Sequence, residues 1–197
     1  LKNDLTDVMN EISTTGKIPL SMSQAVITLL FKNKGNKNDL KNWRPISLCN
    51  VDFKLLTGII ANRMEPYLPY LIHDDQSCGV KGRRMEDQLI YIQEIVDHIR
   101  QFGGQCFLYG LDLQSAFDNV NHQYLSKVMS RLNIGFRLRR LLKTIFANMY
   151  SAVIVNGAKT SYFHLEKSIR QGDKVSMSCF LLAIEPLGNI IRRDNRI

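Results

Sequence analysis

The stretch Leu111-Asp112-Leu113-Gln114-Ser115-Ala116-Phe117-Asp118 places a carboxylate, Asp112, at the end of an apolar run. Residues 106–113 carry apolar side chains on both faces, which predicts a strand at the centre of a covered sheet. Burying an ionised carboxylate there is costly unless a cation meets it. A divalent metal, an arginine partner or a solvent-facing strand end would each remove that cost. We expect Asp118 in the first turn of the next helix, where the helix dipole favours its charge, and interpret it as structural.

Helical and strand patterns are mixed along the chain without the regular alternation of βαβ units. Apolar residues recur with helical spacing in 5–12, 51–64, 89–99, 120–132 and 176–191. Strand patterns occupy 25–31, 151–155 and 161–169. The last two flank Asn156-Gly157, which is a strong hairpin signal. Together these patterns favour an α+β fold.

The composition is that of a folded chain. Its 197 residues are enough for one domain, or one domain plus a piece, and 45% of them are hydrophobic, which excludes wholesale disorder. The longest apolar runs fall short of the ~20 residues that span a bilayer, so we expect no membrane helix and no membrane partner. No charged-then-apolar leader follows Leu1, so we expect an intracellular protein.

The charge balance favours a polyanionic partner. Lysine and arginine total 26 against 18 acidic residues, a formal net charge of +8, and nucleic acid is the commonest partner of such chains. Cysteines stand at 49, 78, 106 and 179, and histidines at 73, 98, 122 and 164. Neither set has the spacing of a metal clip or a disulfide framework, so we expect buried thiols and surface or capping imidazoles.

Blocks of sequence on both sides of Asp112 carry a family resemblance. The segment 111–118 resembles the first catalytic motif of reverse transcriptases, particularly the non-LTR (LINE-type) retrotransposon group, which reads Leu-Asp, three variable residues, Phe-Asp. Further blocks are similar, in order, at Gly16-Lys17-Ile18-Pro19, 27–32, Asn42-Trp43-Arg44-Pro45-Ile46-Ser47-Leu48, 50–54, 61–63, 75–77, 80–83, 155–157 and 170–173. The resemblance covers nearly all 197 residues.

This resemblance implies an RNA-directed DNA polymerase with the right-hand architecture. Residues 1–104 would form the fingers and 105–197 part of the palm, with helices packed on a small, mostly antiparallel sheet and the thumb absent. The family copies an RNA template from a DNA primer or target DNA, using dNTPs and two divalent ions, Mg²⁺ or Mn²⁺, in the complete enzyme. The parent element would act in the cytoplasm and the nucleus.

The resemblance also implies roles for single residues. Asp112 would be the catalytic carboxylate and would bind metal together with the Leu113 carbonyl, while the Ser115 and Ala116 N–H groups would meet the triphosphate. Phe117 would exclude the ribose 2′-hydroxyl. The remaining nucleotide-binding positions would be Lys32, Arg44, Gln171 and Gly172, and the nucleic-acid strands would meet Lys81, Arg83, Arg84 and Arg170. Arginine suits such sites because its planar fork binds phosphate oxygens bidentately.

The sequence departs from the family pattern in one important respect. The family's other catalytic carboxylates lie in a later Tyr/Phe-Ala-Asp-Asp hairpin, and no Asp-Asp pair follows Asp118. Asp74-Asp75 precedes the first motif and fits a fingers block. We therefore expect the 197 residues alone to be inactive. Two alternatives remain: a non-catalytic nucleic-acid-binding remnant, and an intron-maturase type of reverse transcriptase.

Overall fold

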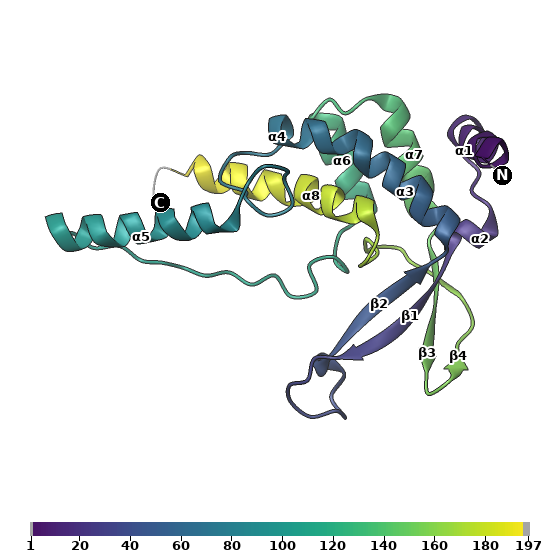
Figure 1. Cartoon of the computed structure of the whole chain (residues 1–197), viewed down its shortest axis with the longest axis horizontal. Helices are drawn as coiled ribbons and strands as arrows, with labels where there is room; N and C mark the ends of the chain where they lie inside the picture. The colour runs from purple at the N-terminus through teal and green to yellow at the C-terminus, as the bar shows by residue number, and fades with distance from the viewer. Residues whose placement is uncertain (1, 195–197) are drawn as a thin grey trace.

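A small mixed sheet projects from one end of a layer of helices in the computed structural model, which describes residues 2–194 (Figure 1). The elements, in chain order, are α1 (Lys2–Thr15), α2 (Leu20–Ser23), β1 (Gln24–Phe31), η1 (Leu40–Asn42), β2 (Trp43–Cys49), α3 (Val51–Met64), η2 (Glu65–Tyr67), α4 (Leu68–Leu71), α5 (Met85–Phe102), α6 (His122–Arg131), α7 (Phe136–Ala147), β3 (Tyr150–Val155), β4 (Ala158–Lys159), β5 (Phe163–His164) and α8 (Lys174–Arg192). The α+β class is therefore confirmed.

The sheet has the strand order β2-β1-β3-β4, with β5 also paired to β3. β1 and β2 form a long antiparallel hairpin in which Thr28 faces Ile46, and β1 also pairs with β3 in parallel. The predicted hairpin at Asn156-Gly157 is confirmed: both residues have positive φ, 51° and 81°, as a tight turn between β3 and β4 requires. The predicted strand 161–169 is mostly irregular, because only Phe163–His164 pairs with β3.

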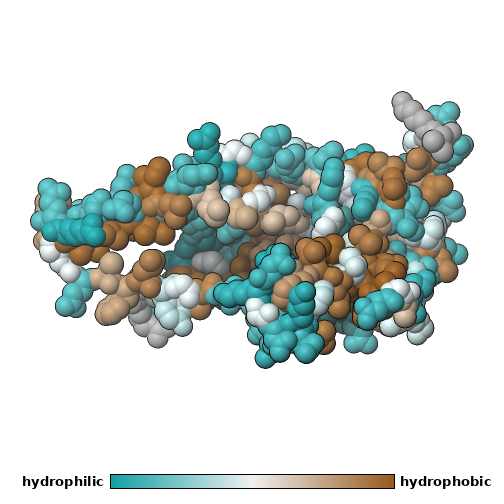
Figure 2. Space-filling view, turned by 60° about the horizontal axis from the view of Figure 1, so that its bottom comes forward, coloured by the Kyte–Doolittle hydropathy of each residue, from teal (hydrophilic) through white to brown (hydrophobic). Residues whose placement is uncertain are grey.

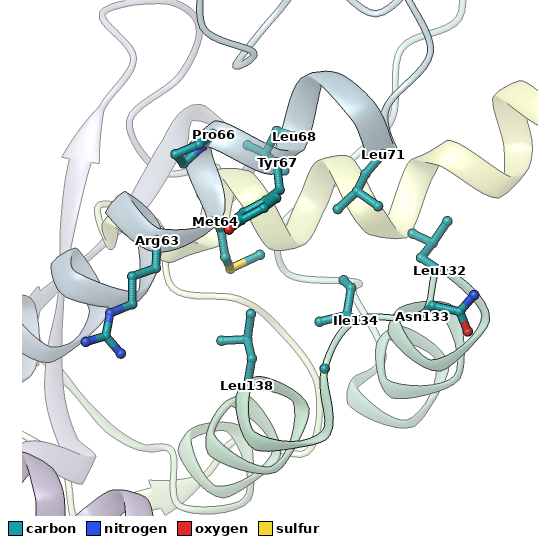
Figure 3. A pocket seen from close by; sticks show the side chains of 11 residues that line it. Arg63, Met64, Pro66, Tyr67, Leu68, Leu71, Leu132, Asn133, Ile134 and Leu138 are labelled. Atoms are coloured by element: carbon teal, nitrogen blue, oxygen red, sulfur yellow. The ribbon is translucent and has the colours of Figure 1, made fainter.

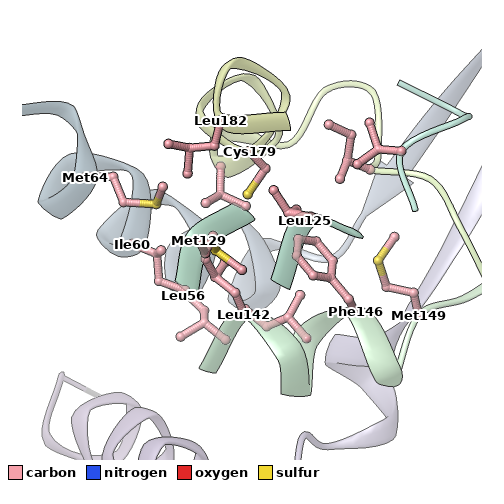
Figure 4. Close-up of a cluster of buried hydrophobic side chains, with 14 of the residues drawn as sticks. Leu56, Ile60, Met64, Leu125, Met129, Leu142, Phe146, Met149, Cys179 and Leu182 are labelled. Carbon is pink, nitrogen blue, oxygen red and sulfur yellow. The ribbon is translucent and has the colours of Figure 1, made fainter. Parts of the chain in front are cut away.

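The core lies between α3, α6, α7 and α8 (Figure 4). These helices place apolar side chains inward at helical spacing, as predicted for α3, α6 and α8; α7 was not predicted. Leu125, Leu142 and Leu182 are completely buried, and each such side chain contributes about 1.5–3 kcal/mol of burial free energy. This layer holds the base of the sheet and the segments that lead into α6 and α8.

Helix α8 is the only helix within residues 2–194 that is long and apolar enough to cross a bilayer by length and composition. One of its faces packs against α3 and α6, with Cys179, Leu181 and Leu182 buried. The buried Glu185 on the same helix is bonded to Arg192 and Asn189. We therefore interpret α8 as a core helix.

The predicted central strand at 106–113 is not formed. Residues 103–113 run as an extended segment without strand pairing, and Phe107, Leu108 and Tyr109 are 79–95% exposed. A central strand needs hydrogen-bonded neighbours on both edges, and no other part of residues 2–194 pairs with this segment. The prediction for Asp118 is also wrong: it lies in a turn over 114–119, and α6 begins only at His122.

Helix α5, which was predicted at 89–99, forms an arm with no buried residue (Figure 1). Its exposed hydrophobic side chains include Leu89, Ile92 and Ile95, and Figure 2 shows hydrophobic surface along the arm. The extended segment 103–113 leads back from the end of α5 towards α6 and exposes further apolar side chains. Helix α5 and this segment thus leave apolar side chains uncovered within residues 2–194.

His122 links the start of α6 to the segment that leads into Arg170. Its Nε2 atom lies 2.7 Å from the Ser168 carbonyl oxygen, and its ring stacks on Phe146. Burial lowers the pKa of His122 below its ordinary value of 6.5. The unfolded chain therefore binds this proton more readily, and stability contributed by neutral His122 is present above the unfolded pKa and is lost as pH falls below it.

We expect the free energy of unfolding to decrease as pH falls below about 6.5. Urea unfolding at about pH 7.5 and about pH 5.5 measures this decrease. His122→Gln has no titrating ring and should show a smaller decrease than the natural chain. An equal decrease in both proteins would contradict the assignment to His122.

Candidate active site

The β1–β2 hairpin presents two of the predicted nucleotide-binding cations near its distal end. The Lys32 N–H donates to the Asn42 carbonyl at 2.8 Å, and the Lys32 Nζ donates to the Lys41 carbonyl at 2.8 Å. Arg44 pairs with Leu30 in the hairpin register and is exposed. No hydrogen bond or ion pair holds the Arg44 side chain within the described residues, so its guanidinium is free to bind an anion.

The turn 114–119 is joined directly to the segment before Arg170. The Ile169 N–H donates to the Phe117 carbonyl and the Ser168 N–H to the Val120 carbonyl, both at 2.9 Å. Inside the turn, Ser115 has a φ of 50° and its carbonyl accepts the Asp118 N–H at 3.0 Å. These bonds bring the first motif, 111–118, next to the Gln171-Gly172 motif, although 52 residues of sequence separate them.

Phe117 packs against the helix that follows the second motif. Its half-buried ring stacks on Phe180 of α8, with centroids 4.9 Å apart and an interplanar angle of 15°. Phe117 thus lies against the hydrophobic core at the edge of the turn. Its partner Phe180 was not predicted from the sequence, because only the fold places position 180 beside the first motif.

Gln171 and Gly172 form a turn against the base of the hairpin. Gly172 has a φ of 96°, and a Cβ at this position would lie 3.8 Å from the Ser47 carbonyl oxygen of β2. Gln171 and Ser47 line a groove of about 500 Å³ together with Asp118. Burial raises the pKa of Asp118, and Lys167 opposes this shift. Asp118 therefore faces the same groove as the Gln171 motif, a position that its interpretation as structural did not include.

Asp112 and Leu113 lie in the extended segment and are exposed. Within the part of the chain that the structure describes, Asp112 has no arginine partner and no hydrogen bond. The alternative of a buried Asp–Arg pair is therefore excluded here. Asp112 and the Leu113 carbonyl offer the oxygen donors that Mg²⁺ prefers, but residues 2–194 contain no cluster of three metal-binding side chains. These residues do not make a complete divalent site by themselves.

Arg170 is not a nucleic-acid contact in this structure, which corrects the prediction for it. Its side chain is only 2% exposed, and Nη2 donates to the Ser23 carbonyl at 2.5 Å and the Tyr150 carbonyl at 2.9 Å. The guanidinium also lies over the Phe53 ring, 5.0 Å from its centroid. Arg170 therefore joins the starts of β1 and β3 to α3.

Arg83 is also structural rather than a phosphate contact. Its side chain is 15% exposed, its guanidinium donates to the carbonyls of residues 69, 72, 73 and 76, and it pairs with Asp74. This satisfies carbonyls at the end of α4 that the helix leaves unpaired. Lys81 and Arg84 are exposed, so both cations lie at the surface. The Lys81 Nζ atom is 3.9 Å from the Glu65 Oε2 atom.

An apolar cavity of about 690 Å³ lies elsewhere, between the α3–α4 corner and the α6–α7 corner (Figure 3). Met64, Leu71, Ile134 and Leu138 are among the side chains that line it. None of the predicted site residues contributes to this lining. The cavity is therefore separate from the groove beside Gln171.

Comparison with known proteins identifies the family. Residues 32–197 match the family model described as reverse transcriptase (RNA-dependent DNA polymerase). The chain belongs to this family. Among relatives of this reverse transcriptase chain, the transposon TX1 uncharacterized 149 kDa protein of Xenopus laevis is 35% identical over 96% of the chain.

Two further relatives carry names of mobile elements. The retrovirus-related Pol polyprotein from type-1 retrotransposable element R2 of Popillia japonica is 24% identical over 87% of the chain. The RNA-directed DNA polymerase from mobile element jockey of Drosophila funebris is 24% identical over 92% of the chain. The chain spans 14% of the TX1 protein, 24% of the R2 polyprotein and 20% of the jockey polymerase.

Proposed function

We propose that this chain forms the fingers, residues 1–104, and part of the palm, residues 105–197, of an RNA-directed DNA polymerase from a non-LTR retrotransposon. Membership of the reverse transcriptase family and the names of the relatives support this proposal. The observation that carries it is the pair of backbone bonds that holds the first motif against the Gln171-Gly172 motif. Those are the two segments that a polymerase needs beside the incoming nucleotide.

The proposed nucleotide site lies between the hairpin and the turn. Lys32, which directly follows β1, and Arg44 of β2 approach the triphosphate from the hairpin, and the Ser115 and Ala116 N–H groups approach it from the turn. Gln171 and Gly172 lie beside the base and the template, where the absence of a Cβ at Gly172 permits close approach of the backbone. Phe117 limits the space at the sugar, and its stacking on Phe180 supports a fixed ring position.

The proposed metal ligands are Asp112 and the Leu113 carbonyl, with further carboxylates from outside residues 2–194. The ion would be Mg²⁺ or Mn²⁺, which take oxygen donors. Asp112 is exposed and has no partner within the described residues, so its carboxylate is accessible to a metal ion. The proposed partners are an RNA template, a DNA primer or target DNA, and dNTPs, with Lys81 and Arg84 as backbone contacts.

Fluorescently labelled dNTP binding by the 197-residue chain tests the proposed nucleotide site. Arg44→Ala should weaken binding about tenfold, because it removes charge-assisted hydrogen bonds from a phosphate. Arg44→Lys keeps the charge without the planar fork and should recover only part of the affinity. The unfolding midpoint should not change, since Arg44 is exposed and unpaired.

The control is Lys34→Ala, which removes one exposed charge from the loop of the same hairpin. If Lys34→Ala weakens dNTP binding as much as Arg44→Ala, the hairpin attracts anions through its general charge, and the proposed nucleotide site is wrong.

A non-catalytic nucleic-acid-binding protein is the second candidate function, favoured by the net charge of +8. In that case dNTP binding should be undetectable while oligonucleotides still bind.

A further inference from the structure

A second groove, of about 500 Å³, runs between α6 and α8 on the side of Lys127, Arg131 and Arg193. Lys127 and Arg131 stand one helical turn apart on α6, and Arg193 is the residue that follows the end of α8. All three side chains are exposed, and none has a hydrogen bond or ion pair within the described residues. Three unneutralised cations therefore converge on one groove.

The acidic side chain in this groove does not neutralise them. Glu185 is buried, and its carboxylate is already engaged by Arg192 and by the Asn189 amide. Apart from Asn189 and Tyr124, the rest of the lining is apolar and includes Val128 and Ile190. The groove therefore presents a positive rim over an apolar floor, which attracts an anionic ligand that also has flat apolar surface.

Tyr124 provides an aromatic surface on the same face. It precedes Lys127 by three positions on α6, so both side chains project in the same direction. The Tyr124 hydroxyl donates to the Ala183 carbonyl of α8 at 3.0 Å, which fixes the ring across the groove while 44% of the residue stays exposed. A fixed, exposed aromatic ring beside cations is the arrangement on which single-stranded nucleic acid stacks its bases.

This groove is separate from the proposed nucleotide site. Gln171 lies just before the start of α8, whereas Arg193 lies at its end, and a 19-residue helix is about 28 Å long. A nucleotide beside Gln171 therefore does not reach Arg193. Any ligand of the α6–α8 groove is a second contact or a more distant part of the same strand.

We propose that the α6–α8 groove binds single-stranded nucleic acid, with phosphates at Lys127, Arg131 and Arg193 and a base on Tyr124. An acidic peptide would satisfy the three cations, but it would make no use of the fixed tyrosine ring. The proposal goes beyond the proposed polymerase site, because it needs neither Asp112 nor a bound dNTP.

Salt-dependent binding of a uridine oligonucleotide of about 12 nucleotides tests the proposal with the 197-residue chain. The triple variant Lys127→Gln, Arg131→Gln, Arg193→Gln should reduce the slope of log K against log salt by about 2, since each lost phosphate contact on a single strand accounts for about 0.7. Tyr124→Leu should weaken binding about tenfold without changing the slope. Circular dichroism checks that each variant is folded.

The matched control is the triple variant Lys17→Gln, Arg137→Gln, Lys143→Gln. It also removes three exposed, unpaired positive charges, from outside the groove. An equal reduction of the slope in both triple variants would overturn the proposal, because net charge alone would then explain binding. An unchanged slope in the groove variant would also overturn it. If Tyr124→Leu has no effect and polyglutamate competes as well as the oligonucleotide, the occupant is an acidic peptide and the proposal is wrong.

These results do not depend on the proposed nucleotide site. Loss of dNTP binding in Arg44→Ala concerns the hairpin, whereas the slope concerns the α6–α8 groove. If the dNTP-binding test contradicts the proposed nucleotide site while the oligonucleotide test gives the expected change in slope, this inference stands and the proposed function is wrong. If the dNTP-binding test gives the expected result and the oligonucleotide test does not, only the proposed function stands.

Discussion

Replacing Arg170 by alanine should lower the free energy of unfolding by about 3 kcal/mol. The substitution removes the guanidinium that donates to the Ser23 and Tyr150 carbonyls and leaves both acceptors without this donor. It also removes the cation over the Phe53 ring. Urea unfolding followed by circular dichroism measures the change, and the unfolding midpoint should fall with little change in the slope.

Two further substitutions make this result specific. Arg170→Lys keeps a cation in the interior but has no planar fork to reach two carbonyls, so it should be intermediate. Arg84→Ala removes an exposed arginine and should change stability by no more than about 0.5 kcal/mol. A small loss in Arg170→Ala, accompanied by weaker oligonucleotide binding, would show that Arg170 faces solvent and would restore its original assignment as a nucleic-acid contact.

Local patterns predicted much of the secondary structure because they depend on neighbouring residues. The apolar spacing in 51–64 and 176–191 gives α3 and α8, and Asn156-Gly157 gives the β3–β4 turn, where two positive φ angles are needed. α7 was missed because its arginines dominate the stretch, although Leu138, Leu142 and Ile145 provide the usual helical stripe. This stripe is the sequence signal from which α7 could have been predicted.

Features that depend on distant partners were not predictable in this way. The apolar composition of 106–113 is typical of a central strand, but composition does not supply the hydrogen-bonded neighbours that a strand requires. The positive charge of Arg83 and Arg170 likewise did not show whether these side chains are exposed or buried. A cationic side chain is usually exposed, but a carbonyl cluster inside the fold can bury it, and only the tertiary structure shows where such a cluster forms.

For the candidate site, the resemblance to reverse transcriptases implied which segments belong together. The backbone bonds of Phe117 and Val120 to residues 168 and 169 join two of these segments. The position of Asp118 in the groove beside Gln171 was not predictable, because it requires the turn 114–119 in place of a helix. The family resemblance thus implied that these segments lie close together, while the directions of their side chains came from the fold.

Asp112→Asn should reduce primer extension about a thousandfold or more in a catalytically complete polymerase that contains this chain. The same change should leave the stability of the 197-residue chain within about 0.5 kcal/mol of the natural one, because Asp112 is exposed and unpartnered. Loss of activity without loss of stability is the expected pattern for a carboxylate that serves a reaction. Gel-based primer extension and urea unfolding measure the two quantities.

The matched control for Asp112→Asn is Asp118→Asn, the same chemical change in the adjoining turn. Burial raises the pKa of Asp118, so the fold already disfavours its negative charge, and a neutral amide should be tolerated there. We expect the complete polymerase to keep most of its activity with Asp118→Asn, and the 197-residue chain alone to incorporate no dNTP. Asp112-dependent incorporation by the 197-residue chain alone would contradict the need for further carboxylates. Equal losses from both substitutions would instead assign the effect to the net charge of segment 111–118 and remove the special role proposed for Asp112.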